Sequence, residues 1–215
     1  MSTGSVKTIA ISLFLLASTA LAGESRVVHD AARNQFWVLQ SDAVYLHDAT
    51  TRALKKRFDL PGWIHVGEPY ACGPDLALDA QGAAVVTSNV VPVLWRIDPR
   101  KSEVTTHELA LDADADKDVG FAGLVYAPDQ GVFFAVSGVY GSLWRIDPLL
   151  RRAQKIALSA AIAEPCGLSI ERTKTRRTLV LCPASTAQRG WAVHLAADQR
   201  SAYVLARSCA QASAL

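Results

Sequence analysis

The sequence predicts an all-β fold, a β-propeller with four blades of four antiparallel strands, and three observations lead to this prediction. The hexapeptide LWRIDP occurs twice, at Leu94–Pro99 and at Leu143–Pro148. Each copy lies in a longer unit whose short apolar segments are separated by turn residues. No long stretch shows the 3.6-residue period of an amphipathic helix. Such self-similarity is typical of small sheets that pack on one another, because one sheet alone cannot bury both of its faces.

The two best-matched units are Asp75–Leu111 and Gly123–Ser159. The first two apolar segments of each are joined by a short turn, Asp-Ala-Gln-Gly in one unit and Pro-Asp-Gln-Gly in the other. Gly82 and Gly131 supply the positive φ that such turns require. Each unit is therefore expected to begin with a tight β-hairpin and to continue into a four-stranded sheet.

Two weaker copies of the unit flank this pair, at Val27–Leu60 and at Gly167–Ala206. Together the copies cover nearly all of the chain after its first residues, which predicts four blades and about sixteen strands. An aromatic residue marks the third strand of each unit, where we expect it to pack between blades: Tyr45, Trp95, Trp144 and Trp191. The alternatives are an all-β sandwich and an incomplete propeller that pairs with another chain.

Residues 1–22 have the pattern of a secretory signal peptide. Lys7 precedes an apolar run over 9–17, and the tripeptide Ala-Leu-Ala ending at Ala22 has the small residues of a cleavage site. The alternative is a membrane anchor, but the apolar run is too short to span a bilayer comfortably. We therefore expect a propeller domain over 23–215, located in the periplasm or outside the cell, with no membrane span after cleavage.

The charge balance and the motifs restrict the function. The chain has 22 Lys and Arg against 20 Asp and Glu, without a basic block, which argues against nucleic-acid binding. No G-x-S-x-G or H-E-x-x-H is present, and the five histidines are scattered. Among these histidines, His65 is the best candidate for an acid or base, because acidic residues lie near it in the sequence. No complete catalytic set of residues can be recognised.

One face of the predicted propeller is the best place for a ligand. The loops that connect successive blades share this face with the loops between the second and third strands of each blade. Loops that converge in this way often bind small molecules. The candidate ligand-binding residues on these loops are His65, Glu68, Tyr70, Asn89, Tyr140, Glu164 and Arg189. The alternative is that they are ordinary solvated loop residues.

The segment DADADKDVG, residues 112–120, is a candidate cation site. Alternating carboxylates suit a hard divalent cation such as calcium, and they come from Asp112, Asp114, Asp116 and Asp118. However, Lys117 and Gly123 stand where an EF-hand loop has glycine and glutamate, so the segment is not an EF-hand. A weak cation site and a solvated acidic loop both remain open. No other cofactor is indicated.

The segment EPCGLSIERTKTRRTLVLC, from Glu164 to Cys182, resembles gluconolactonase-type propellers. Such proteins often have Pro-Asn-Gly-Leu before a strand, a turn and a second strand, and Pro165, Gly167 and Leu168 match this pattern. At the level of its repeats the whole chain is similar to extracytoplasmic propellers of the NHL, YVTN and gluconolactonase group. The resemblance implies the propeller architecture, which serves many different functions.

One departure from the lactonase pattern concerns the metal. The asparagine of that motif is a metal ligand in the lactonases, and here its position holds Cys166. A cysteine does not replace an amide oxygen at a calcium-type site. We therefore expect an exported, non-catalytic module that binds an unknown small molecule or protein. The alternative is a metal-dependent hydrolase of the lactonase kind.

The cysteines predict disulfides. Four are present, and an even number in an exported protein favours pairing over the alternative of four reduced, buried thiols. If the hairpin over 166–182 turns near Lys174, Cys166 lies directly opposite Cys182, at a separation that suits a disulfide. The second expected pair is Cys72 with Cys209, which would close the ring of blades.

Overall fold

The computed structural model describes residues 26–66, 72–112, 119–160, 162–163, 166–172, 177–181 and 189–208. The expected signal peptide, residues 1–22, lies outside these ranges. Over the described ranges the chain is nearly all β, with one short 3-10 helix at Ala31–Arg33. None of the helical structure in this part of the chain is long and apolar enough to cross a membrane.

The strands follow one another as antiparallel arrays of four, here called arrays 1 to 4. Array 1 is a separate sheet of β1 (Arg26–Asp30), β2 (Gln35–Leu39), β3 (Val44–Asp48) and β4 (Leu54–Phe58). Array 2 is a separate sheet of β5 (Leu76–Leu78), β6 (Ala84–Thr87), β7 (Val93–Asp98) and β8 (Glu103–Glu108). The short β9 (Ala110–Leu111) then pairs with a strand of array 3.

Arrays 3 and 4 belong to one larger sheet. Array 3 contains β10 (Gly123–Ala127), β11 (Val132–Val136), β12 (Leu143–Ile146) and β13 (Arg152–Leu158). Array 4 contains β14 (Ser169–Arg172), β15 (Arg177–Leu181), β16 (Arg189–Leu195) and β17 (Ser201–Ser208). A short parallel pairing of β13 with β17 joins the two arrays, and β10 also contacts β14, so that these eight strands nearly close on themselves.

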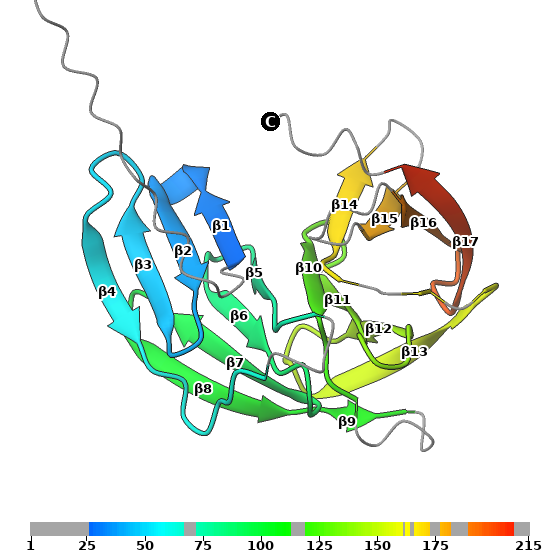
Figure 1. The fold of residues 1–215 in the computed structure, drawn as a ribbon, viewed down its shortest axis with the longest axis horizontal. Coiled ribbons are helices and arrows are strands. Elements are labelled where there is room, and N and C mark those ends of the chain that lie inside the picture. Colours follow the sequence, from blue (N-terminus) through cyan, green and yellow to red (C-terminus); the bar gives the residue numbers. More distant parts are fainter. Residues whose placement is uncertain are drawn as a thin grey trace, which may run out of the picture.

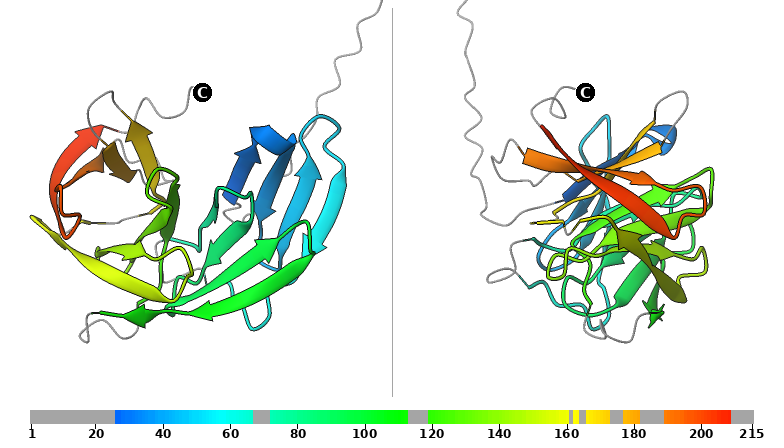
Figure 2. Two further views of the ribbon diagram at one scale, coloured as in Figure 1. Left: turned by 180° about the vertical axis from the view of Figure 1, so that it is seen from behind. Right: turned by 90° about the vertical axis from the view of Figure 1, so that its right-hand side faces the viewer.

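The four arrays are arranged along an arc, with arrays 1 and 4 at its two ends (Figure 1). The view from behind shows the same order (Figure 2). The first strands of the arrays lie on the inner side of the arc, where β1 contacts β5, β5 contacts β10 and β10 contacts β14. The inner strands therefore bring residues from all four repeats close together.

The hydrophobic core is divided among the three interfaces between successive arrays. Each interface has its own cluster of buried side chains, and the tryptophan from the third strand of the later array either belongs to this cluster or, for Trp191, packs against it. Trp95 packs between arrays 1 and 2, Trp144 between arrays 2 and 3, and Trp191 between arrays 3 and 4. For the three tryptophans, the prediction that they pack between successive repeats is confirmed.

Tyr45 differs from the three tryptophans, although it also lies in the third strand of its array. Its hydroxyl donates to Asp42 at 2.7 Å and accepts from the Arg57 guanidinium at 3.3 Å. The ring therefore belongs to the polar face of array 1 that is turned away from array 2. No array precedes array 1 among the described residues, so Tyr45 has no earlier sheet to pack against.

The structure explains why LWRIDP occurs twice. Its leucine, tryptophan and isoleucine are buried in both copies. Its aspartate closes the hairpin that follows: Asp98 accepts from the backbone N–H groups of Arg100 and Lys101, and Asp147 accepts from that of Leu149 at 2.8 Å. The same six residues thus supply a core face and a turn cap to two successive arrays.

The disulfide links Cys72 to Cys166, 94 residues apart in the sequence, with a Cα–Cα distance of 5.4 Å. Both expected pairs, Cys166–Cys182 and Cys72–Cys209, are therefore wrong. The expected hairpin register would have placed Ser169 opposite Leu179, whereas Ser169 pairs with Val180. A slip of one residue turns every side chain to the other face, so the geometric argument for Cys166–Cys182 fails. Cys182 and Cys209 lie outside the described residues.

Candidate ligand-binding face

A buried carboxylate, Asp75, joins three inner strands. It precedes β5 and is 3% exposed, and one of its oxygens lies 2.7 Å from Nε of Arg26 on β1. It also accepts from the backbone N–H groups of Leu76 at 2.7 Å and of Leu124, on β10, at 2.8 Å. Burial raises the pKa of Asp75, and the opposing charge of Arg26 only partly offsets this. Asp75 thus fixes the relative positions of arrays 1, 2 and 3.

The segment that leads into array 2 is held by Asn89, one of the predicted ligand-binding residues. Asn89 is 3% exposed, and its side-chain amide donates to the backbone carbonyls of Val66 at 2.7 Å and of Cys72 at 3.1 Å. Its carbonyl oxygen is buried and has no hydrogen-bond partner among the described residues. Asn89 therefore positions the loop that carries the disulfide, and this structural role was not anticipated from the sequence.

His65 lies on the same loop. Its ring meets that of Trp63 edge-on, with the ring centroids 5.9 Å apart. A side chain added at Gly73 would lie 3.7 Å from Nε2 of His65, so the histidine lies beside the segment that follows Cys72. The structure thus brings His65, Asn89 and the Cys72–Cys166 bridge together on the face predicted for ligand binding.

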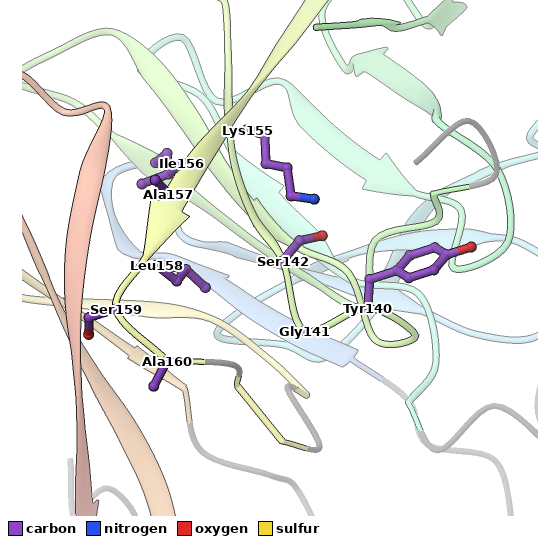
Figure 3. A pocket seen from close by; sticks show the side chains of 9 residues that line it. All are labelled: Tyr140, Gly141, Ser142, Lys155, Ile156, Ala157, Leu158, Ser159 and Ala160. Carbon is purple, nitrogen blue, oxygen red and sulfur yellow. The ribbon is translucent and has the colours of Figure 1, made fainter. Parts of the chain in front are cut away.

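A cavity of about 640 Å³ opens on this face at array 3 (Figure 3). Its walls come from the β11–β12 loop, with Tyr140, Gly141 and Ser142, and from the end of β13 and the following residues, 155–160. Figure 3 shows the side chains of Ser142 and Lys155 projecting toward the same open region beside β13, whereas the Tyr140 ring, which also lines the cavity, points away from the strand. The volume is in the range typical of small-molecule sites, which is roughly 300–1,000 Å³.

The chemistry of this cavity is organised by the buried indole of Trp144. The indole N–H donates to the Ser142 hydroxyl at 2.8 Å, and the Lys155 ammonium lies 5.9 Å from the centre of the indole ring. Because Ser142 uses an oxygen lone pair for Trp144, its own proton can be donated to a ligand. Tyr140 adds an aromatic side chain that is 49% exposed. The cavity therefore combines a cation, a hydroxyl donor and an aromatic surface.

The backbone at Gly141 fixes the loop that carries Tyr140 and Ser142. Gly141 has a φ of +60°, and its backbone N–H donates to the Ser137 carbonyl at 3.0 Å. A Cβ at this position would collide with the Ile162 carbonyl of the loop that leads into array 4. Only glycine meets both conditions, because L-residues rarely adopt this conformation and no room is left for a side chain.

The remaining predicted residues are distributed as follows. Asp112 lies beside β13, and its carboxylate accepts from the Lys155 backbone N–H at 2.8 Å. Arg189 begins β16, but its side chain is not among those described. The other candidates lie outside the described residues: Glu68, Tyr70, Asp114, Asp116, Asp118 and Glu164.

The metal prediction is constrained at one position. Cys166 holds the place of the lactonase metal ligand, and here its sulfur is bonded to Cys72. A disulfide sulfur is not the thiolate that metals bind. Within the described ranges, no group of three or more His, Cys, Asp and Glu side chains is placed to hold a metal ion. A calcium site in the 112–118 segment therefore stays a prediction.

The sequence reasoning missed Ser142 and Lys155. Comparison of the two best repeats contains the signal that would have identified them. Ser142 occupies the position of Val93, and Lys155 that of Thr106. Array 3 therefore has a hydroxyl in place of an apolar residue, and it has a charged residue opposite its third-strand tryptophan, Trp144. Such differences between otherwise matching repeats indicate a site that belongs to one repeat only.

Comparison with known proteins supports the fold. No protein-family model matches the sequence. No curated protein sequence matches it either. Hydrazine synthase of Kuenenia stuttgartiensis is similar in structure, with a TM-score of 0.60, 12% identity, and coverage of 93% of this chain and 53% of that chain.

Two further solved structures show the same likeness. Virginiamycin B lyase of Staphylococcus aureus has a TM-score of 0.55 at 13% identity, with 81% of this chain and 52% of that chain covered. An auxiliary nutrient binding protein of Bacteroides thetaiotaomicron has a TM-score of 0.56 at 11% identity, with 84% of this chain and 40% of that chain covered. The chain thus spans about half the length, or less, of these three proteins. The similar structures are mostly β-propellers, and at these identities they show the fold alone.

Proposed function

We propose that the protein is an exported, non-catalytic binding module in which arrays 1 to 4 are the four blades of a propeller domain spanning residues 23–215. The observation that carries this proposal is the cavity beside Tyr140. It lies on the loop face where propellers collect ligands, and it combines Ser142, Lys155 and an exposed aromatic ring in a volume of about 640 Å³.

The lining of the cavity favours a small acid with an apolar or aromatic body. The Lys155 ammonium suits an anionic group, and the Ser142 hydroxyl can donate to the same group. Tyr140, Ala157 and Leu158 offer apolar surface for the rest of the molecule. We infer that Glu68, Tyr70, Glu164 and Arg189 extend the same face toward the ligand, and that a weak calcium site in the 112–118 segment is separate from it.

Two observations support export. The Cys72–Cys166 disulfide is typical of proteins that fold in an oxidising compartment. The structural neighbours include a protein described as an auxiliary nutrient binding protein, a role compatible with a location outside the cytoplasm. A periplasmic or secreted location also agrees with the signal-peptide pattern of the first 22 residues.

Calorimetric titration with phenylacetate tests the proposed function, with phenylacetamide as the neutral control. We expect phenylacetate to bind more tightly than the amide, because only the acid can pair with Lys155. Lys155→Met should remove this preference, whereas Lys101→Met, in an exposed turn of array 2, should keep it.

The aromatic wall has its own matched control. Tyr140→Ala should weaken phenylacetate binding, whereas Val91→Ala should not, because Val91 is the corresponding exposed residue in array 2 and is 42% exposed. Equal binding of acid and amide, or equal affinity in all four variants, would contradict the proposed site.

A further inference from the structure

A second cavity, of about 530 Å³, lies at the other end of β13. The first cavity uses residues 155–160, whereas the second uses the start of the strand, together with β9 and the β12–β13 hairpin. Its polar lining is unusually rich in charge and comes from Asp112, Arg145, Asp147, Arg152 and Gln154. The two cavities therefore lie along the same strand, β13, but no residue lines both of them.

Arg145 is the arginine of the second LWRIDP copy, and its counterpart in the first copy is Arg96. Each arginine occupies the same place in its sheet: Arg96 lies opposite Val85 and Thr105, and Arg145 lies opposite Phe134 and Gln154. Every one of these positions is separated from its counterpart by the same distance in sequence. The two arginines can therefore be compared directly.

Arg96 has an internal partner. Its Nε and Nη2 donate to one oxygen of Asp79, at 3.2 and 2.7 Å. Asp79 precedes the first hairpin turn of array 2, and its side chain is only 9% exposed. The pair is thus a half-buried, charge-assisted interaction that belongs to the repeat itself.

Arg145 lacks this partner, because Pro128 occupies the position of Asp79 in array 3. A proline has neither a carboxylate nor a backbone N–H. The Nε of Arg145 is buried, and no residue in the described part of the chain accepts its hydrogen bond. A buried N–H without an acceptor is unfavourable, and a guanidinium is especially suited to an anion with two coplanar oxygens.

The carboxylates in the cavity wall are already engaged with backbone groups. Asp147 accepts from the backbone N–H groups of Leu149, Arg151 and Arg152. Asp112 accepts from the Lys155 backbone N–H at 2.8 Å. These bonds hold both aspartates in the wall, where each carboxylate keeps an additional lone pair for a hydroxyl group. Gln154 adds an amide that can both donate and accept.

We propose that this cavity binds the carboxylate of a small hydroxylated acid, which takes the place at Arg145 that Asp79 takes at Arg96. The hydroxyl groups of the ligand face Asp112 and Gln154. This inference goes beyond the proposed function and does not depend on it, because the site uses neither Tyr140, Ser142 nor the Lys155 ammonium.

Titration of the full chain with D-glucuronate tests the proposal, with D-glucose as the neutral control and inorganic phosphate as a second anion. We expect glucuronate to bind, and glucose and phosphate to bind at least about tenfold more weakly, because they lack the planar carboxylate. Arg145→Gln should weaken glucuronate binding by about tenfold or more. Arg100→Gln, in an exposed turn of array 2, should leave it unchanged.

A second variant keeps Arg145 and supplies the missing partner from the protein. Pro128→Asp restores the residue found in array 2, so it should abolish glucuronate binding and raise the melting temperature. Ala80→Asp adds the same charge at an exposed turn position and should do neither. Far-UV circular dichroism confirms folding, and if Arg145→Gln does not fold, Pro128→Asp still decides the question.

Three results would overturn the proposal. The first is no measurable glucuronate binding by the unmodified chain, or binding equal to that of glucose. The second is glucuronate binding that is unchanged in Pro128→Asp. The third is phosphate binding that depends on Arg145 without glucuronate binding, which would assign the cavity to free phosphate instead of a carboxylate.

Discussion

Replacing Asp75 by asparagine tests how the inner strands are held together. The carboxylate accepts two backbone N–H groups and pairs with Arg26, which is 44% exposed. An asparagine has one oxygen, so one of the two N–H groups is left without an acceptor in a site that is 3% exposed. Such a loss costs about 1–3 kcal/mol. The freed Arg26 can be hydrated, which limits its share to about 0–1 kcal/mol.

Together these contributions predict that Asp75→Asn lowers the free energy of unfolding by about 1–4 kcal/mol. Chemical denaturation at pH 7 measures this difference, and a chain of this size should also melt about 2–4 °C lower for each kcal/mol lost. In a double-mutant cycle with Arg26→Gln, the double variant should lose less than the sum of the single variants, because each leaves a partner behind. A change within about 0.5 kcal/mol for Asp75→Asn, typical of a surface position, would refute the reasoning.

The stability difference between the natural chain and Asp75→Asn depends on pH with a definite sign. Because burial raises the pKa of Asp75, the folded protein binds this proton more tightly than the unfolded chain does. The stability that this tighter proton binding contributes is therefore fully present below the unfolded pKa, about 3.9. It is lost as the pH rises through the raised pKa of the folded state. The stability difference between the natural chain and Asp75→Asn should shrink over this window, and a difference that grows with pH would contradict the direction.

Three further predictions concern other parts of the fold. Peptide mapping without reduction should recover Cys72 linked to Cys166, and reduction should cost about 4–5 kcal/mol in the chain-entropy model; a Cys72–Cys209 linkage would contradict the structure. Gly141→Ala should destabilise the protein more than Gly62→Ala in thermal unfolding, because both glycines have positive φ but only Gly141 faces a neighbouring carbonyl; equal losses would disprove the clash. Burial, Arg96 and Arg151 lower the pKa of His107 despite Asp147, so the natural chain should lose stability as the pH falls through about 6.5, and His107→Gln should reduce this loss; identical pH profiles would argue against it.

Repetition in the sequence was enough to predict the all-β architecture and its core. Trp95, Trp144 and Trp191 recur in the third strands, and all three pack between successive arrays. Periodic spacing is informative here because each repeat must bury the same face. Tyr45 shows the limit of the argument, since a residue at the same repeat position faces outward when no array precedes its own.

The disulfide and the cavities depend on details that the repeat does not determine. The Cys166–Cys182 prediction required the hairpin register to be known to a single residue, and the register differs by one. Asn89 was predicted to bind a ligand from its loop position alone, and the sequence did not indicate that its amide donates to two loop carbonyls. Ser142, Lys155 and Arg145 stand out only when one repeat is compared with another. Array 2 has neither the hydroxyl nor the ammonium at the corresponding positions, and it has the carboxylate, Asp79, that Arg145 lacks.

The most direct test of the proposed ligand-binding face is chemical-shift mapping. The ¹⁵N-labelled full chain is titrated with phenylacetate, and the amide signals that move are assigned. The proposed site predicts that the largest shifts come from residues 140–142 and 155–160, the two segments that line the cavity at array 3. Shifts centred on the corresponding loop of array 2, near Val91, or no saturable shifts at all, would contradict it.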